Sequence, residues 1–319
     1  MIRIYKKVSD MEIQEIDRPE RDCWINVYPP FEPEALETLA ADVGVPLDFL
    51  TDSIDINERS RYEEDDGVKL IVINTPIENY DVKVTDTEAD YVTIPIGIVL
   101  TENMILTISS TKNPVMEWFV HNIIKNLKPY QRERFVLRIV ERNNAYFLHY
   151  LNEINKRRYL IEKELYNSSR NQELSRLLNI QKSLVYFVTN LRANELLMMK
   201  IKRSNFLDIN DQEEELDFLE DIIIDNSQAL EMANVYANIL NGTMDAFASI
   251  ISNNLNEVMR RLTSITVILM LPTLVASLYG MNIVPLPFSE SPYAFWIIVA
   301  VSIALAFLLY LIFRRRRWF

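Results

Sequence analysis

The hydrophobic pattern of the chain changes near its C-terminal end. Two apolar runs there contain no charged residue, Leu262 to Leu278 and Tyr293 to Phe313. A helix needs about 20 apolar residues to cross the hydrocarbon core of a bilayer, with about 17 as the lower limit. Both runs reach that limit. We therefore predict transmembrane helices at 262–282 and 293–313, joined by an external loop at 283–292.

The basic residues around these runs predict how the spans are oriented. Arg260 and Arg261 precede the first run, and four arginines lie in the tail 314–319, whereas the loop has no Lys or Arg. Short cytoplasmic segments of membrane proteins carry the excess of Lys and Arg. We expect a multi-pass protein of the cell membrane, in contact with the lipid bilayer, with both termini in the cytoplasm.

Short apolar runs separated by turn signals predict a mixed α/β domain over 1–130. Asp66-Gly67 between two such runs is a strong hairpin signal. Helices are predicted where apolar residues recur every three or four positions and where Pro or Gly marks a boundary. We expect strands at 1–6, 23–28, 59–64, 68–76, 91–100 and 104–109, and helices at 33–43, 46–53 and 113–127.

Helical periodicity dominates the remainder of the chain. Residues 131–210 are expected to form an antiparallel helix pair, broken near Asn167-Ser168-Ser169. A stalk helix follows over 211–261, and without a proline between Gln212 and Leu271 it can continue into the first span. The predicted fold class is an α+β cytoplasmic domain plus a long stalk helix continuous with the first of two transmembrane helices.

The stalk carries a heptad-like apolar seam in which steps of three and four alternate. A helix of this length needs partners along it, and self-association of copies of the chain is the simplest source. The seam consists of Leu216, Leu219, Ile223, Asn226, Leu230, Ala233, Ala237, Leu240, Met244, Phe247 and Ile251.

Charge and composition narrow the function further. The formal net charge of −12 argues against nucleic acid as a partner, and none of the five glycines lies in a phosphate-binding loop, which argues against a nucleotide. We expect neither an enzyme nor an ATP-driven pump. His121 and His149 are interpreted as structural. Cys23 is the only cysteine and cannot form an intrachain disulfide, which fits a cytoplasmic soluble part.

Acidic residues occupy the stalk without any basic residue from Ser204 to Met259. One reading is a solvated acidic helix face. In a symmetric assembly, however, the repeated charge would repel unless cations gather there, and carboxylates and water are the ligands that Mg²⁺ prefers.

A polar stripe follows the first span at the same three-four rhythm. It predicts a pore wall for a hydrated divalent ion, because no carboxylate lies on it and Mg²⁺ loses water reluctantly. Met259, Leu262 and Met270 are candidates for apolar constrictions that gate by dewetting. The alternative is ordinary helix packing through small residues. The stripe consists of Asn256, Met259, Thr263, Thr266, Met270, Thr273, Ser277 and Gly280.

The end of the first span carries the most specific motif, Tyr279-Gly280-Met281-Asn282. Together with Asn256-Glu257-Val258-Met259 at the inner end and the basic, aromatic tail, it resembles the CorA family of divalent-cation transporters. The resemblance implies a homopentamer that imports Mg²⁺, with Co²⁺ or Ni²⁺ as further ions, and a selectivity mouth of Gly280, Met281 and Asn282. The loop 285–290 departs from the family pattern, so no role follows for Glu290.

The same resemblance implies regulation by bound Mg²⁺. Asp221 occupies the position of a regulatory aspartate in the family, and its partner from a neighbouring subunit would be Glu78 or Asp81. Two other functions stay open. One is a zinc transporter of the same superfamily, although Met281 favours magnesium. The other is a non-conducting, membrane-anchored coiled-coil scaffold or sensor.

Overall fold

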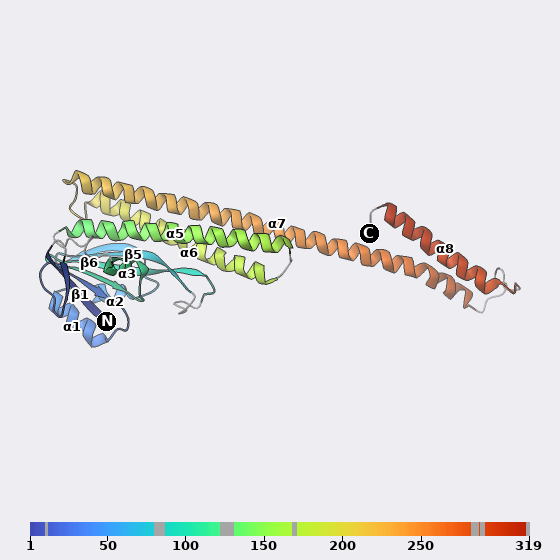
Figure 1. Cartoon of the computed structure of the whole chain (residues 1–319), viewed down its shortest axis with the longest axis horizontal. Coiled ribbons are helices and arrows are strands. Elements are labelled where there is room, and N and C mark those ends of the chain that lie inside the picture. The colour runs from blue at the N-terminus through green and yellow to red at the C-terminus, as the bar shows by residue number, and fades with distance from the viewer. Residues whose placement is uncertain are drawn as a thin grey trace. The chain divides into compact units, whose positions relative to one another are not determined.

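The computed structural model describes residues 1–9, 12–79, 87–121, 131–167, 171–281, 287 and 291–316. The chain forms two compact units, Met1–Gly242 and Thr243–Phe319. One helix, α7 (Glu213–Tyr279), belongs to both units, and Figure 1 shows it leading to the last helix, α8 (Ala294–Arg315). An α/β domain followed by a long helix that continues into the apolar segment confirms the predicted fold class.

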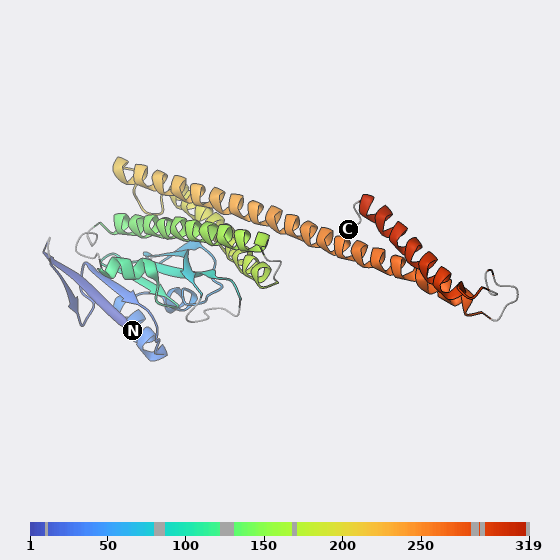
Figure 2. The same ribbon diagram turned by 45° about the vertical axis from the view of Figure 1, so that its right-hand side comes forward.

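The first unit is built on a sheet with the strand order β2-β1-β3-β7-β6-β5-β4. Among the described pairs, β3 and β7 run parallel and the other neighbours run antiparallel. Figure 2 shows this unit from a second side. The strands are β1 (Ile2–Ser9), β2 (Glu12–Ile16), β3 (Cys23–Val27), β4 (Arg61–Asp65), β5 (Val68–Glu78), β6 (Tyr91–Leu100) and β7 (Ile105–Ser109).

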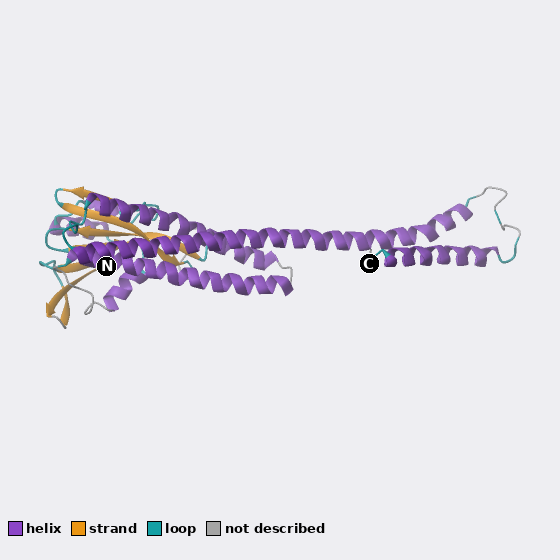
Figure 3. Cartoon of the chain, turned by 90° about the horizontal axis from the view of Figure 1, so that it is seen from above, coloured by secondary structure: helices purple, strands orange, loops and turns teal. Residues whose placement is uncertain are grey.

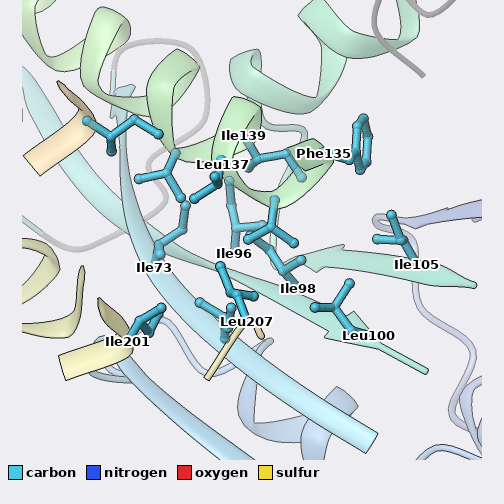
Figure 4. Packing of buried hydrophobic residues seen from close by; sticks show 14 of the residues in the cluster. Ile73, Ile96, Ile98, Leu100, Ile105, Phe135, Leu137, Ile139, Ile201 and Leu207 are labelled. Atoms are coloured by element: carbon cyan, nitrogen blue, oxygen red, sulfur yellow. The ribbon is translucent and has the colours of Figure 1, made fainter. Parts of the chain in front are cut away.

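Helices cover both faces of this sheet, which explains why β5 and β6 are almost entirely buried. One face packs against α1 (Pro33–Val43) and α2 (Leu47–Asp52). The other packs against α3 (Pro114–His121), α5 (Arg132–Asn167) and α6 (Asn171–Ser204). Figure 4 shows the second core, in which strand residues such as Ile73 and Ile96 lie beneath residues of α5 such as Ile139.

Gly97 marks the closest approach between a helix and the sheet. A Cβ atom at this position of β6 would lie 2.0 Å from Ser53 Oγ, at the end of α2. Ser53 is fully buried and its hydroxyl donates to Phe49 O (2.6 Å), so it cannot move aside easily. The absence of a side chain at Gly97 therefore lets α2 rest directly on the central strands.

The upper part of α7 packs on α5 and α6 within the first unit. Asn144 Nδ2 donates to Ile222 O (2.9 Å), and Asn226 Nδ2 donates to Leu191 O (2.9 Å). Thus helices of the same chain supply the partners that we expected from other copies for this part of the stalk. The seam is also rotated from the predicted one, since Ile223 and Leu230 are only half-buried. Its buried positions are Leu219, Ile222, Asn226, Ala229, Ala233 and Leu240.

Most of the predicted elements are found, with three differences. The strand β2 is not predicted from the sequence, because its two apolar residues, Ile13 and Ile16, are three positions apart and do not show the alternation of a strand. The helix predicted at 113–127 is described only as Pro114–His121, and its remainder lies outside the described residues, as do 168 and 169 of the predicted break. The return helix, predicted over 174–201, begins earlier, at Asn171, and ends later, at Ser204. The hairpin turn is confirmed, with φ of 43° at Asp66 and 80° at Gly67.

Candidate functional site

Two described helices are long and apolar enough to cross a membrane, the second part of α7 and α8. Both spans predicted from the sequence therefore fall on helices. α7 passes through Pro272 without interruption, although proline has no N–H to donate to the carbonyl of Ile268. α8 returns beside the second part of α7, as Figure 1 and Figure 3 show.

The predicted polar stripe lies on one face of α7. The least exposed side chains of this segment, at Ser264, Ile268, Leu271 and Val275, mark another face, and α8 is the described helix of this unit that can cover them. At 100° per residue, the centre of the stripe lies roughly 140° from that face. The stripe is thus turned away from α8 and is exposed in the single chain at Asn256, Met259, Thr263, Thr266, Met270, Thr273 and Ser277.

Two hydroxyl groups of the stripe, those of Thr266 and Thr273, are arranged as acceptors. Thr266 Oγ1 donates to Leu262 O (2.9 Å), and Thr273 Oγ1 donates to Leu269 O (3.0 Å). Each hydroxyl proton is therefore used within the helix, while the oxygen keeps lone pairs that can accept. The water molecules around a hydrated cation point their hydrogens outward, so this arrangement suits contact with a hydrated ion.

The candidate constrictions are not all equivalent. Met259 and Met270 lie on the stripe and are 52% and 63% exposed in the single chain. Leu262 is 56% exposed but lies about 70° from the centre of the stripe at 100° per residue. It belongs to a neighbouring apolar row with steps of four and three, formed by Ile251, Leu255, Val258, Leu262, Ile265 and Leu269.

The mouth motif follows the last residue of α7. Gly280 N–H donates to Ala276 O (2.9 Å) and Ser277 O (3.2 Å), which closes the helix end. A Cβ on Gly280 would lie 3.4 Å from Ala276 O, an ordinary contact, so packing within this chain does not require glycine there. Met281 is 48% exposed. Asn282 and Glu290 lie outside the described residues.

Several acids of the upper stalk already have basic partners in the same chain. Arg134 of α5 contacts Glu215 (2.7 Å) and Glu214 (3.6 Å), Lys202 contacts Glu220, and Lys69 contacts Asp208 (2.5 Å). The acids in this segment are thus less uniformly available for cations than the sequence alone indicates.

Asp221 belongs to an exposed acidic row on α7. Asp217, Asp221 and Asp225 are all exposed and four residues apart, so they follow one side of the helix. The sequence places Asp217 and Asp225 among the acids of the stalk, but only Asp221 is singled out there as a regulatory residue. The signal that could have singled out the other two is this repeated spacing of four.

Glu78, the proposed partner, lies at the exposed end of β5. The pKa values of Tyr91 and Tyr150 are raised, mainly by burial and next by the negative charge of Glu78, which places Glu78 near these two phenols. No contact joins Glu78 to Asp221 among the described interactions of this chain, and the described residues contain no group of three potential metal ligands. Asp81 lies outside the described residues.

These features define a membrane protein with two spans, in which the first span continues a helix of a large α/β unit and carries a polar face. The family described as "CorA-like Mg2+ transporter protein" matches residues 20–315. The chain belongs to the CorA family. This result confirms the resemblance inferred from the Tyr279–Asn282 motif.

Individual relatives agree with this assignment. The chain is 31% identical over 311 residues to the cobalt/magnesium transport protein CorA of Methanocaldococcus jannaschii, covering 93% of this chain and 92% of that protein. The complete structure of the CorA magnesium transporter from that organism matches with a TM-score of 0.85 and 26% identity, over 100% of this chain and 99% of the other. The ZntB cytoplasmic domain from Vibrio parahaemolyticus shares the fold of the α/β unit, with a TM-score of 0.60 and 12% identity over 79% of this chain and 98% of that one.

Proposed function

We propose that this protein is a homopentameric, channel-like importer of hydrated Mg²⁺ in the cell membrane, with both termini in the cytoplasm and with Co²⁺ or Ni²⁺ as further ions. The observation that carries this proposal is the polar face of α7. Its side chains are exposed in the single chain, it is turned away from α8, and the hydroxyl oxygens of Thr266 and Thr273 can accept from ion-bound water. The face ends at Gly280 and Met281, where the mouth begins.

The exposed apolar row supports self-association. Leu255 and Val258 are each 60% exposed in the single chain, although they precede the membrane span. Apolar side chains repeated in steps of four and three are typical of a helix that packs on other helices. In the proposed pentamer, this row would pack against neighbouring subunits on the flank of the polar face, which would leave that face for the central ion path.

The membrane potential is sufficient to drive import. An inside-negative potential of 100 mV favours a divalent ion by about 4.6 kcal/mol, twice the value for a single charge. At about 1.4 kcal/mol per decade, this corresponds to a concentration ratio above a thousandfold. A chain without a nucleotide-binding loop therefore needs no other energy source for uptake.

Bound Mg²⁺ would close the pore from the cytoplasmic side. The row formed by Asp217, Asp221 and Asp225 offers three carboxylates. The segment from Ser204 to Met259 contains no Lys or Arg that could neutralise them. Glu78 or Asp81 of a neighbouring subunit would complete the site with Asp221 through a hydrated ion. Loss of the ion would restore repulsion between subunits, and α7 would transmit the movement to Met259 and Met270.

Ion flux into liposomes that contain the pure protein tests this function. We expect potential-driven Mg²⁺ uptake, weaker passage of Co²⁺ and little Zn²⁺ uptake. Faster transport of Zn²⁺ than of Mg²⁺ would favour the zinc transporter. A correctly assembled protein that conducts none of the three ions would favour the membrane-anchored scaffold or sensor.

A further inference from the structure

A cavity of about 190 Å³ opens in the α/β unit, at the ends of β3 and β7. Its wall combines residues of β1, β3 and β7 with the first residues and one face of α3. The cavity lies entirely in the first unit and uses none of the residues assigned to the ion path or to its regulation.

The chain topology places this cavity where α/β proteins commonly bind ligands. β3 and β7 are parallel neighbours, so their carboxyl ends meet at the same edge of the sheet. β3 leads to α1 on one face of the sheet, whereas β7 leads to α3 on the opposite face. Connections that leave neighbouring parallel strands in opposite directions open a crevice at their carboxyl ends, and ligands bind in such crevices.

Two buried polar side chains on the wall, Asn113 and Ser109, each have one atom without a hydrogen-bond partner among the described residues. Asn113 is 2% exposed, and its Oδ1 accepts from Val115 N–H (2.9 Å) at the start of α3. Its Nδ2 donates to no described group, and Oγ of Ser109, which is also 2% exposed, is unpartnered as well within the described residues. Leaving buried donors unpaired is unfavourable, so these atoms point to an acceptor that the chain itself does not provide.

The charges on the wall favour an anion. Arg3 and Lys112 contribute positive charge, and the N-terminal end of α3 adds a partial positive charge, although its Val115 and Glu117 N–H groups already donate to Asn113. Glu117 is the one acidic residue among the lining residues. The only ion pair described for Arg3, to Glu15, is long (3.7 Å) and exposed, so it contributes little. The neighbouring Tyr5 hydroxyl, which also lines the cavity, raises the pKa of Arg3, so the guanidinium stays charged.

We propose that this cavity binds a small phosphate-bearing anion, either inorganic phosphate or a compact phosphate monoester. The phosphate oxygens would accept from Asn113 Nδ2, from Ser109 and from the cations Arg3 and Lys112. The volume is below the range of about 300–1,000 Å³ typical of sites for larger organic ligands, which favours a compact anion over a nucleotide.

Calorimetric titration of the full-length protein in detergent with inorganic phosphate, without Mg²⁺, tests the proposal. Asn113→Asp keeps the oxygen that caps α3 but replaces the donor with a carboxylate oxygen, and it should weaken phosphate binding by about tenfold or more. Lys112→Gln should weaken it severalfold. Arg18→Gln removes an exposed cation that does not line the cavity and should bind phosphate like the wild type.

The controls separate a folding defect from lost binding and identify the source of the phosphate. Each variant is first compared with the wild type by circular dichroism and melting temperature. If Asn113→Asp is misfolded, the exposed Lys112 carries the test alone. Tighter binding of glycerol phosphate than of inorganic phosphate would identify a monoester as the ligand. The proposal is overturned if phosphate shows no saturable binding at millimolar concentrations, or if wild type and both variants bind phosphate equally. It is also overturned if the protein binds malonate, a dicarboxylate, more tightly than phosphate.

Discussion

Arg134→Met should destabilise the first unit by releasing the start of α7 from α5. Arg134 Nη1 contacts Glu215 Oε1 at 2.7 Å, and the Glu215 side chain is only 8% exposed. The second carboxylate oxygen of Glu215 has no hydrogen-bond partner among the described residues. The substitution would therefore leave a buried carboxylate without its main partner, in a helix turn that also contains Glu213 and Glu214.

The size of the effect follows from the burial of the pair. Removing one member of a fully buried ion pair costs about 3–5 kcal/mol. The Arg134 side chain is 33% exposed, and the N-terminal end of α7 favours negative charge, so we reduce this figure to about 2–3 kcal/mol. For a unit of this size, about 1 kcal/mol corresponds to 2–4 °C in melting temperature. The expected decrease is therefore about 4–12 °C.

The matched control is Lys202→Met, which breaks the contact with Glu220 on the same helix. That pair is 37% and 50% exposed, so its loss should cost less than about 1 kcal/mol. Tryptophan fluorescence on heating reports on the core of the first unit, where Trp24 is fully buried. The double substitution Arg134→Met with Glu215→Met should recover most of the loss, since an apolar pair avoids the unpaired charge. Equal melting temperatures for Arg134→Met and Lys202→Met would refute the reasoning.

Two further predictions concern the ion path. Asn282→Ala and Gly280→Ala should abolish Mg²⁺ uptake while the protein still assembles. A Cβ on Gly280 meets only an ordinary contact, so misfolding would not explain the loss in that variant. Normal flux from either variant would contradict the assigned mouth. In a Cys23→Ser background, a cysteine at Thr273 should react with a water-soluble thiol reagent and one at Ile268 should not, because they lie on different faces of α7; equal labelling would mean that the polar face is misassigned.

The sequence predicts the fold best where one strong local signal decides it. The hairpin at Asp66-Gly67 and the two apolar helices depend on such signals, and the structure confirms them. The strand β2 has no apolar pattern and forms because β1 offers a free edge, so it depends on contacts that are distant from its own residues. The rotation of the buried seam from Ile223 to Ile222 has a similar origin, because α5 and α6 decide which side of α7 is covered.

The candidate site was predictable to a similar extent. Regular spacing along one helix identified the polar stripe, since every member except Gly280, which follows the last residue, lies on α7. Spacing could not show that Arg134 and Lys202 neutralise acids of the stalk, because these contacts join helices far apart in the sequence. The cavity beside Asn113 was missed for the same reason, since strands β1, β3 and β7 contribute to it.

The regulatory role of Asp221 gives the last prediction. With basic partners assigned to Glu214, Glu215 and Glu220, the exposed row with Asp217 and Asp225 becomes the best candidate for a Mg²⁺ ligand on α7. Asp221→Ala should weaken the protection that millimolar Mg²⁺ gives against proteolysis. Asp221→Lys supplies a fixed positive charge and should resist opening when Mg²⁺ is removed. Both substitutions remove the same carboxylate. Asp221→Ala therefore reports on loss of the bound ion, whereas Asp221→Lys replaces the charge of the ion with that of the lysine.

For Mg²⁺ to act as a switch, it must bind the closed state more tightly than the open one. Protection and flux should therefore change together: Asp221→Ala should conduct at Mg²⁺ concentrations that close the wild type, and Asp221→Lys should stay closed without Mg²⁺. Glu214→Ala is the control, because Arg134 already neutralises this exposed acid and its loss should alter neither property. If wild type, Asp221→Ala and a variant that also lacks Glu78 and Asp81 are protected equally by Mg²⁺, the regulatory site lies elsewhere. Loss of protection in Glu214→Ala as well would instead indicate that Mg²⁺ responds to the total charge of the stalk rather than to a site at Asp221.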